Sequence, residues 1–432
     1  MKNNIKESEH ISSEWKECKL GELTVVITKG TTPSSLGGKF IEKGINYIKS
    51  EAVSYHGKID KSTFVFIDEA MHQKLKRSQL AKDDILYSMA GIFLGKNGLV
   101  TEDMLPANTN QALAIIRLNQ EKANPKFIHY YLRQRSVIDF VNNMSGQSAQ
   151  PNLNFEEIKS IDILLPPLPE QTAIASILSS LDDKIDLLHR QNKTLEQLAE
   201  TLFRQWFVEE AEESWEEKSF GELIESTLGG EWGKENLEGD FQLQVQCIRG
   251  TDIADLKVGL PERTPIRFIK QTKFESIEIK DGDLVMEISG GTDTQSTGRT
   301  TYINDDVKAL FKYPLVFSNF CRLIRPRKKE YSFFLYAYIN NLYAQGDLFN
   351  LENGSSGIKN LNYKALLFNL EYKMPSEKRI IQFHKDVEQY FHKINVNKVQ
   401  IRTLTQTRDT LLPKLMSGEI RVSLADVTQD SK

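Results

Sequence analysis

Residues 174–206, IASILSSLDDKIDLLHRQNKTLEQLAETLFRQW, decide much of the fold. From Ile174 to Trp206 the apolar residues recur at alternating steps of four and three positions, and Asn192 interrupts them. This spacing is the a/d heptad pattern of a helix that pairs with another helix. A second such pattern, shifted by 209 residues, runs from Phe383 to Leu415 and contains Asn397. The sequence therefore predicts two long helices that form a coiled coil.

The two helices belong to two copies of one larger unit. Short segments recur in the same order at nearly constant offset, which is far longer than the period of a solenoid repeat. The matching pairs are Glu14–Leu23 with Ser214–Leu223, Ile48–Val53 with Ile248–Ile253, Lys82–Leu86 with Lys280–Val285, Asn152–Phe155 with Asn360–Tyr363, and Thr194–Leu202 with Thr403–Leu411. The chain is thus a duplication of a unit of roughly half its length.

Each copy divides into a globular part and a helix. Short β-type runs such as Val25–Ile27, Phe64–Ile67 and Ala114–Ile116, separated by Gly, Asn and Ser, indicate α+β domains. The predicted fold is α+β, with two pseudo-two-fold-related α+β domains joined by two long antiparallel coiled-coil helices. The predicted boundaries are a tail (1–13), a first domain (14–168), a helix (169–208), an acidic solvated linker (209–213), a second domain (214–374), a second helix (375–418) and a tail (419–432).

The polar residues in the heptad pattern suggest how the helices pair. If the helices run antiparallel, a register in which facing residue numbers sum to about 589 places Asn192 against Asn397, so that two buried amides satisfy each other. Arg408 then faces Leu181 and must reach water or an acidic group. The other predicted layers pair Leu188 with Ile401, Ile185 with Leu404, Leu178 with Leu411, Leu195 with Ile394, Leu202 with Val387, and Ala199 with Tyr390. Packing of each helix on its own globular domain remains the alternative.

Composition excludes several classes of protein. The 432 residues carry 55 Lys and Arg against 59 Asp and Glu, so any nucleic-acid surface must be a local cluster of basic residues. No apolar run approaches the ~18 residues of a membrane helix, and the first ten residues lack the apolar region of a signal peptide. The three cysteines are far apart in sequence, which favours neither a disulfide framework nor a zinc site and fits a reducing cytoplasm.

The sequence contains no convincing catalytic or metal-binding constellation. Asn124-Pro125-Lys126-Phe127 lacks the second proline of an amino-methyltransferase loop and is better explained as a helix start. A phosphate-binding glycine loop is also missing. A magnesium nuclease could be imagined from Glu262, Glu278 and Lys280, but the other repeat has no matching carboxylates. We therefore predict no catalytic residue, no metal site and no cofactor in this chain.

The chain resembles the specificity (S) subunit of type I restriction-modification enzymes over essentially its whole length. The residues that carry the resemblance are Trp15 with Leu20–Leu23, Lys29–Ser34, Leu165–Gln171, Leu202–Phe207 and Leu411–Ile420. The second copy departs from the pattern, because Met374–Lys378 stands where the first copy has Leu165–Gln171. The resemblance implies two target recognition domains that each read half of a split, asymmetric sequence in double-stranded DNA. It also implies a helical spacer, two methyltransferase (M) subunits, and restriction/translocase (R) subunits. S-adenosylmethionine (SAM), ATP and Mg²⁺ would belong to those partners, and no membrane is involved.

Polar, glycine-rich loops at matching places in both repeats are the candidate DNA-binding residues. Base readout uses Arg, Lys, Asn, Gln, Ser and Thr, although any one of these loops could equally be a plain surface turn. The candidates are Lys29, Thr31, Thr32, Ser34, Lys49, Lys96, Asn97, Gln147, Ser148 and Gln150 in the first domain, and Arg249, Thr251, Thr292, Gln295, Ser296, Arg299, Ser355, Ser356 and Lys359 in the second. The basic run Arg325–Lys329 is either a phosphate contact or a solvated turn.

The leading hypothesis is a DNA reader and scaffold that has no catalytic activity of its own. The alternatives are an S-like chain of another restriction-modification type, a nuclease or methyltransferase with unrecognised motifs, and a coiled-coil scaffold for proteins without a DNA role. Activity assays on the isolated chain distinguish the enzyme from the reader. A bipartite methylation pattern that depends on this chain distinguishes the reader from the scaffold.

Overall fold

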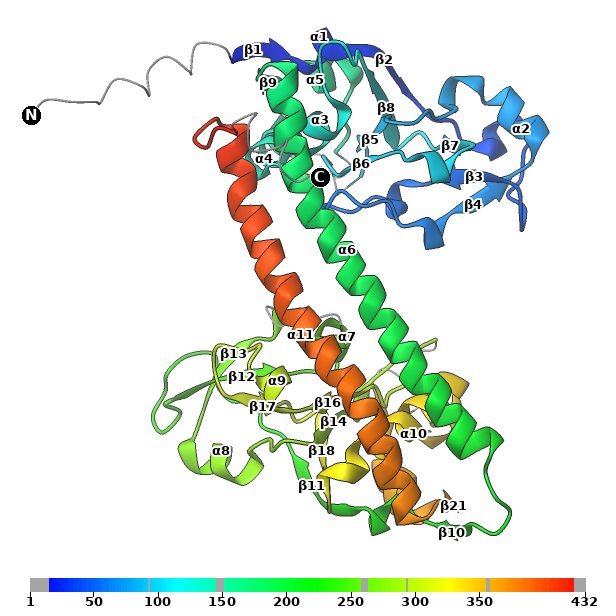
Figure 1. The fold of residues 1–432 in the computed structure, drawn as a ribbon, viewed down its shortest axis with the longest axis vertical. Helices are drawn as coiled ribbons and strands as arrows, with labels where there is room; N and C mark the ends of the chain where they lie inside the picture. Colours follow the sequence, from blue (N-terminus) through cyan, green and yellow to red (C-terminus); the bar gives the residue numbers. More distant parts are fainter. Residues whose placement is uncertain are drawn as a thin grey trace, which may run out of the picture. The chain divides into compact units, whose positions relative to one another are not determined.

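A computed structural model describes residues 15–91, 94–144, 151–257, 263–292, 294–354 and 358–422 (Figure 1). The chain forms two compact units. Unit 1 combines the residues up to Asp183 with those from Gln406 onward, and unit 2 is the continuous segment Lys184–Thr405. Each unit therefore contains one globular domain and parts of both long helices.

Unit 1 is built on two small sheets. The four-stranded antiparallel sheet has the order β2 (Thr24–Lys29), β8 (Leu113–Leu118), β5 (Ile85–Ser88) and β6 (Asn97–Leu99). The three-stranded sheet has the order β4 (Val65–Ile67), β3 (Ile45–Ile48) and β7 (Ala107–Thr109), with β3 and β7 parallel. β1 (Lys16–Lys19) pairs with β9 (Asp162–Leu165). The helices of this domain are α1 (Leu20–Leu23), α2 (Glu69–Lys74), α3 (Pro125–Tyr131), α4 (Arg135–Met144) and α5 (Phe155–Lys159).

Unit 2 repeats this topology. Its four-stranded sheet has the order β11 (Ile224–Gly229), β18 (Cys321–Pro326), β14 (Asp283–Glu287) and β16 (Thr300–Ile303). Its three-stranded sheet has the order β13 (Ile266–Ile269), β12 (Leu243–Ile248) and β17 (Leu315–Phe317), with β12 and β17 parallel. β10 (Glu216–Lys218) pairs with β21 (Tyr372–Met374), and β15 (Ser289–Gly290), β20 (Lys359–Leu361) and β19 (Glu352–Asn353) form a third small sheet. The helices are α7 (Asp252–Lys257), α8 (Gln271–Ile277), α9 (Asp305–Lys308) and α10 (Ser332–Gln345).

The two heptad segments form the helices α6 (Leu168–Arg204) and α11 (Glu377–Met416). In unit 2 they lie side by side and antiparallel (Figure 1), and the amide Nδ2 of Asn397 donates to Oδ1 of Asn192 at 2.8 Å. Leu188, Ile401 and Ile185 are buried in one cluster, and the partly buried Leu404 packs against it. These contacts follow the register that places Asn192 against Asn397.

The ends of the helices pack on the globular domains instead. Leu178 joins the core of unit 1 with Leu415. Ala199 joins the core of unit 2, against which Tyr390 is partly buried. Ile394 is 1% exposed, whereas Leu195 is only half-buried. The helices thus pair with each other in the middle and pack on the globular domains at their ends. Each of the two alternatives that the sequence left open therefore holds for part of the heptad pattern.

Arg408 in α11 finds an acidic partner rather than water. Its Nη1 lies 2.6 Å from Oδ1 of Asp182 in α6, and the residue is 4% exposed. Arg133 and the hydroxyl of Tyr130 bind the other oxygen of Asp182, at 3.0 and 2.8 Å. This network joins α11, α6 and α3 inside unit 1.

The acidic segment 209–213 is not simply a solvated linker. Oε2 of Glu210 accepts from Arg379 at 2.8 Å, and the Arg379 guanidinium lies over the rings of Trp206 and Trp215. Unit 1 contains a similar closure, in which Arg421 binds Glu170 through two hydrogen bonds of 2.7 Å and lies over the ring of Trp15. An arginine, a glutamate and a tryptophan therefore fasten the helix ends in both units.

Candidate nucleic-acid interface

Several predicted reader loops of unit 1 meet at the end of β7. Gly30 N donates to Asn110 O at 3.2 Å, Met89 N to Ala112 O at 3.0 Å, and Leu153 N to Met89 O at 2.8 Å. These backbone bonds join residues 29–34, 110–112, 89–91 with 94–96, and 151–153 in series. We call this set of segments loop edge 1.

Unit 2 contains the same arrangement at the end of β17. Glu231 N donates to Phe317 O, Ile288 N to Phe320 O, and Leu361 N to Ile288 O, each at 2.9 Å. We call residues 229–232, 318–320, 288–292 with 294–299, and 358–361 loop edge 2. The two edges therefore share a backbone framework but carry different side chains.

A glycine makes the close approach possible in each edge. A Cβ atom on Gly30 would lie 1.8 Å from the carbonyl oxygen of Thr109, and one on Gly230 would lie 2.2 Å from the carbonyl oxygen of Phe317. Both distances are far inside van der Waals contact, so any side chain at these positions would push the first loop away from the edge.

In loop edge 1, the structure places the predicted residues Lys29, Thr31, Thr32 and Ser34 at or near the surface. The hydroxyl of Thr32 donates to the side-chain oxygen of Gln111, while Nη2 of Arg77 donates to Oγ1 of Thr31 at 3.3 Å. Arg77 brings a basic turn to this edge, since Lys74 and Lys76 are also exposed. The prediction missed this turn, whose only sequence signal is three basic residues within four positions.

The other candidates of unit 1 differ in their surroundings. Lys96 extends over the ring of Tyr55, with Nζ 5.3 Å from its centre, and burial lowers the Lys96 pKa. Lys49 lies 3.8 Å from Glu51. Asn97 corrects the prediction, because it is 1% exposed and faces His129 Nδ1 at 2.7 Å in the core, where it cannot reach a base. Gln147, Ser148 and Gln150 lie outside the described residues.

In unit 2, both predicted arginines bind acidic side chains of the chain itself. Arg299 makes two hydrogen bonds of 2.7 and 2.8 Å to Glu287, which is 2% exposed. Arg249 makes bonds of 2.8 and 3.0 Å to the carboxylate of Asp252, which is 1% exposed. Each guanidinium thus offsets a buried negative charge, which gives the arginine a structural task beside any contact with DNA.

The polar residues around Arg299 are divided between surface and core. Thr251, Thr292 and Gln295 are exposed, whereas Ser296 is 3% exposed and therefore lies inside the fold, contrary to its assignment as a reader. Nζ of Lys359 donates to the carbonyl oxygen of Thr292 at 3.2 Å. Ser355 and Ser356 lie outside the described residues.

The basic run 325–329 is largely occupied by internal ion pairs. Arg325 binds the buried Asp283 at 2.7 Å, Lys328 binds Glu377, and Lys329 lies 2.8 Å from Asp281. The Arg325 pair has a counterpart in unit 1, where Arg117 binds Asp84 at 2.7 Å. The duplication of this pair indicates a role in holding the four-stranded sheet.

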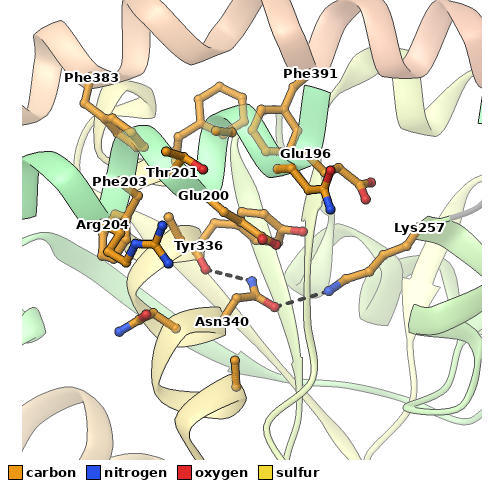
Figure 2. Close-up of a pocket in the computed structure, with 16 residues that line it drawn as sticks. Glu196, Glu200, Thr201, Phe203, Arg204, Lys257, Tyr336, Asn340, Phe383 and Phe391 are labelled. Atoms are coloured by element: carbon orange, nitrogen blue, oxygen red, sulfur yellow. Dashed lines mark hydrogen bonds between the residues drawn. The ribbon is translucent and has the colours of Figure 1, made fainter. Parts of the chain in front are cut away.

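Unit 2 also contains a cavity of about 550 Å³ between α6, α10 and α11 (Figure 2). Phe203, Phe383 and Phe391 line one side, while Glu196 and Lys257 contribute ionisable groups. Nζ of Lys257 donates to Asn340 at 3.2 Å, as the dashed line shows. Burial raises the pKa of Glu196 and lowers that of Lys257, so the surroundings of the cavity disfavour charge.

The described residues give no support to a metal centre or a membrane segment. Among them, no three His, Cys, Asp or Glu side chains are grouped so as to hold a metal ion. None of the helices in the described ranges combines the length and the apolar character needed to cross a bilayer.

Comparison with known proteins places this fold. The family model described as the type I restriction modification DNA specificity domain matches residues 12–197. The MjaIX specificity subunit of Methanocaldococcus jannaschii is 24% identical over 346 residues, covering 73% of this chain and 74% of the relative. The HindI specificity subunit of Haemophilus influenzae is 23% identical, covering 94% of this chain and all of the relative.

The chain is similar to type I restriction-modification specificity subunits over most of its length. A solved S subunit from M. genitalium has the same fold, with a TM-score of 0.59 at 18% identity over 96% of this chain and 99% of that one. The similarity to specificity subunits therefore extends over both repeats and both helices of the chain, although the family model itself matches the first repeat and most of α6.

Proposed function

We propose that the chain is the DNA-reading subunit of a type I restriction-modification complex. Its two target recognition domains, residues 14–168 and 214–374, would each read one half of a bipartite, asymmetric target in double-stranded DNA. The observation that carries this proposal is that loop edges 1 and 2 repeat one backbone framework with different side chains. A shared framework suits two similar approaches to the duplex, and different side chains suit two different base sequences.

The helices α6 and α11 would set the spacing of the two half-sites and carry the partner subunits. Four large aliphatic residues are 40–48% exposed on these helices, which favours a covered protein surface over a solvated one. They are Leu187, Leu198, Val396 and Val399. We assign this surface to two methyltransferase (M) subunits, and further restriction/translocase (R) subunits would complete the assembly.

Catalysis would belong to those partners. The sequence offers neither an amino-methyltransferase loop nor a phosphate-binding loop, so SAM, ATP and Mg²⁺ would be bound by M and R. The assembled complex would methylate adenine and cut DNA in an ATP-dependent reaction, and this chain would supply the sequence choice. We place the complex in the cytoplasm, which fits three cysteines that form no disulfide.

Methylation mapping tests the proposal directly. The chain is co-expressed with its M subunits in a host that lacks DNA methylation, and modified adenines are mapped by long-read sequencing. We expect one bipartite motif that disappears when this chain is omitted. Exchange of residues 14–168 for those of a relative should change one half of the motif and leave the other. Methylation or cleavage by the isolated chain, or a motif that persists without it, would refute the proposal.

A further inference from the structure

One turn in each loop edge lies between the predicted loops and was not itself predicted. In unit 1 the turn Asn110-Gln111-Ala112 precedes β8, and in unit 2 the turn Ser318-Asn319-Phe320 precedes β18. Both turns close with the same backbone bond, which runs from the first residue of the following strand to the carbonyl of the first turn residue. These bonds are 3.4 Å for Leu113 N to Asn110 O and 2.9 Å for Cys321 N to Ser318 O. Gln111 is therefore the structural equivalent of Asn319.

The two turns are central in their edges because other loops bond to them on both sides. In loop edge 1, the backbone amides of Gly30 and Met89 donate to carbonyl oxygens of the turn. In loop edge 2, the amide of Ile288 donates to the turn, and the amide of Glu231 donates to Phe317, the residue before the turn. A ligand that touches several loops of either edge would therefore lie next to the turn. The tips carry Gln111 and Asn319, both exposed, and Phe320, which is 49% exposed.

The chemistry of the tips suits the edge of a base pair. A side-chain amide offers a donor and an acceptor side by side, which matches N7 and N6 of adenine in the major groove. The neighbouring aromatic ring of Phe320 offers the apolar contact that a thymine methyl group accepts. Amides at equivalent positions in two diverged repeats point to a shared task for the two turns.

The surroundings of each tip support such a contact. In loop edge 1, the hydroxyl of Thr32 donates to the side-chain oxygen Oε1 of Gln111 and so orients the amide, while the exposed Lys29 and Arg77 lie on the adjoining segments. In loop edge 2, Arg322 is the second residue after the turn and lies over the ring of Tyr363, 4.4 Å from the ring centre. Basic side chains next to an amide suit this task, because they bind the phosphates of DNA and so position the amide against a base.

We propose that Gln111 and Asn319 each read one base pair, with adenine as the preferred base, in their own halves of the DNA target. Phe320 adds an apolar contact in the second half. This inference rests on the proposed function and names the residues that determine its sequence specificity.

The test uses the full chain assembled with its M subunits and compares methylation motifs. Gln111→Ala should relax the motif at one position of one half-site, and Asn319→Ala should relax one position of the other. Binding of the intact target should weaken roughly tenfold or more, while binding of unrelated DNA stays unchanged. Gln120→Ala is the matched control, because Gln120 is an exposed glutamine at the opposite end of β8 and should leave the motif intact.

The outcomes separate this inference from the function on which it rests. If the wild-type complex yields no bipartite motif, the proposed function itself fails. If the wild type yields the motif and both alanine variants retain it, only the assignment of Gln111 and Asn319 fails. A uniform loss at all positions also overturns the assignment, and Gln111→Glu, which keeps the shape but removes the amide donor, repeats the test should the alanine variant unfold.

Discussion

The Asn192–Asn397 pair offers the sharpest test of the helix pairing. Asn397 is 0% exposed and Asn192 is 6% exposed, and a single hydrogen bond of 2.8 Å joins their amides. Replacing Asn397 with Leu leaves the amide of Asn192 buried opposite a methyl group. An unsatisfied buried amide costs roughly 1–3 kcal/mol, and we expect Asn397→Leu to lower the free energy of unfolding of unit 2 by about that amount.

The double variant Asn192→Leu/Asn397→Leu should recover most of this loss. It removes both polar groups and places two leucines in a layer next to Leu188 and Ile401. Replacing both partners of a buried hydrogen bond with apolar groups is nearly neutral. The free energy of unfolding of the double variant should therefore be ~2 kcal/mol or more above the value obtained by adding the losses of the two single variants.

Urea unfolding of the full chain, followed by tryptophan fluorescence, measures these free energies. Three of the four tryptophans, Trp206, Trp215 and Trp232, lie in unit 2, so the signal reports chiefly on that unit. Gln191→Leu is the control, because it replaces an exposed amide next to Asn192. Strictly additive single variants, or an Asn397→Leu protein as stable as the wild type, would show that the amides do not depend on each other.

Three further outcomes follow from buried charges. Arg299→Ala should destabilise unit 2 by roughly 3–5 kcal/mol because it leaves the charge of Glu287 buried without a partner. The double variant Arg299→Met/Glu287→Met should restore stability in urea unfolding. If specific DNA binding also returns in the double variant, Arg299 reads no base. Burial lowers the pKa of Lys398 from 10.5 to about 8. The free energy of unfolding should therefore rise between about pH 8 and 10.5, because in this range the folded chain holds Lys398 neutral while the unfolded chain must protonate it. At pH 7, Lys398→Met should stabilise the chain by roughly 3 kcal/mol, and the exposed Lys385→Met is the control that should have no effect. Burial alone would raise the pKa of Asp182, but Arg133 and Arg408 hold it below 3.8. The charged Asp182 should therefore stabilise unit 1 above about pH 4, and this contribution should be lost as the solution is acidified further. Asp182→Asn should remove this contribution from acid-unfolding curves.

The paired helices could be predicted from sequence because their signal is periodic and local. Alternating steps of three and four residues identify the buried stripe, and the two asparagines within it determine the register. The packing of Phe203 and Phe383 into the core of unit 2 could not be separated from that stripe, because both kinds of contact require apolar residues at the same spacing.

The candidate site was predicted less completely because its contacts join distant segments. The sequence identifies Arg249 and Arg299 as donors, but residue type alone does not reveal that Asp252 and Glu287 already hold their guanidinium groups. Asn97 was assigned to a surface loop, although its partner His129, 32 residues away, draws it into the core. The turn at Gln111 has no periodic signal at all, and only the backbone bonds from Gly30 and Met89 show its central place.

The closure of unit 1 by Arg421 and Glu170 has a consequence for synthesis on the ribosome. Unit 2 is one continuous segment, whereas unit 1 needs the residues from Gln406 onward, which are translated after unit 2. The domain that emerges first must therefore wait for the end of α11 before Arg408 can neutralise Asp182 and the guanidinium of Arg421 can reach Glu170. A nascent chain that stops after unit 2 would hold one finished domain and one open one.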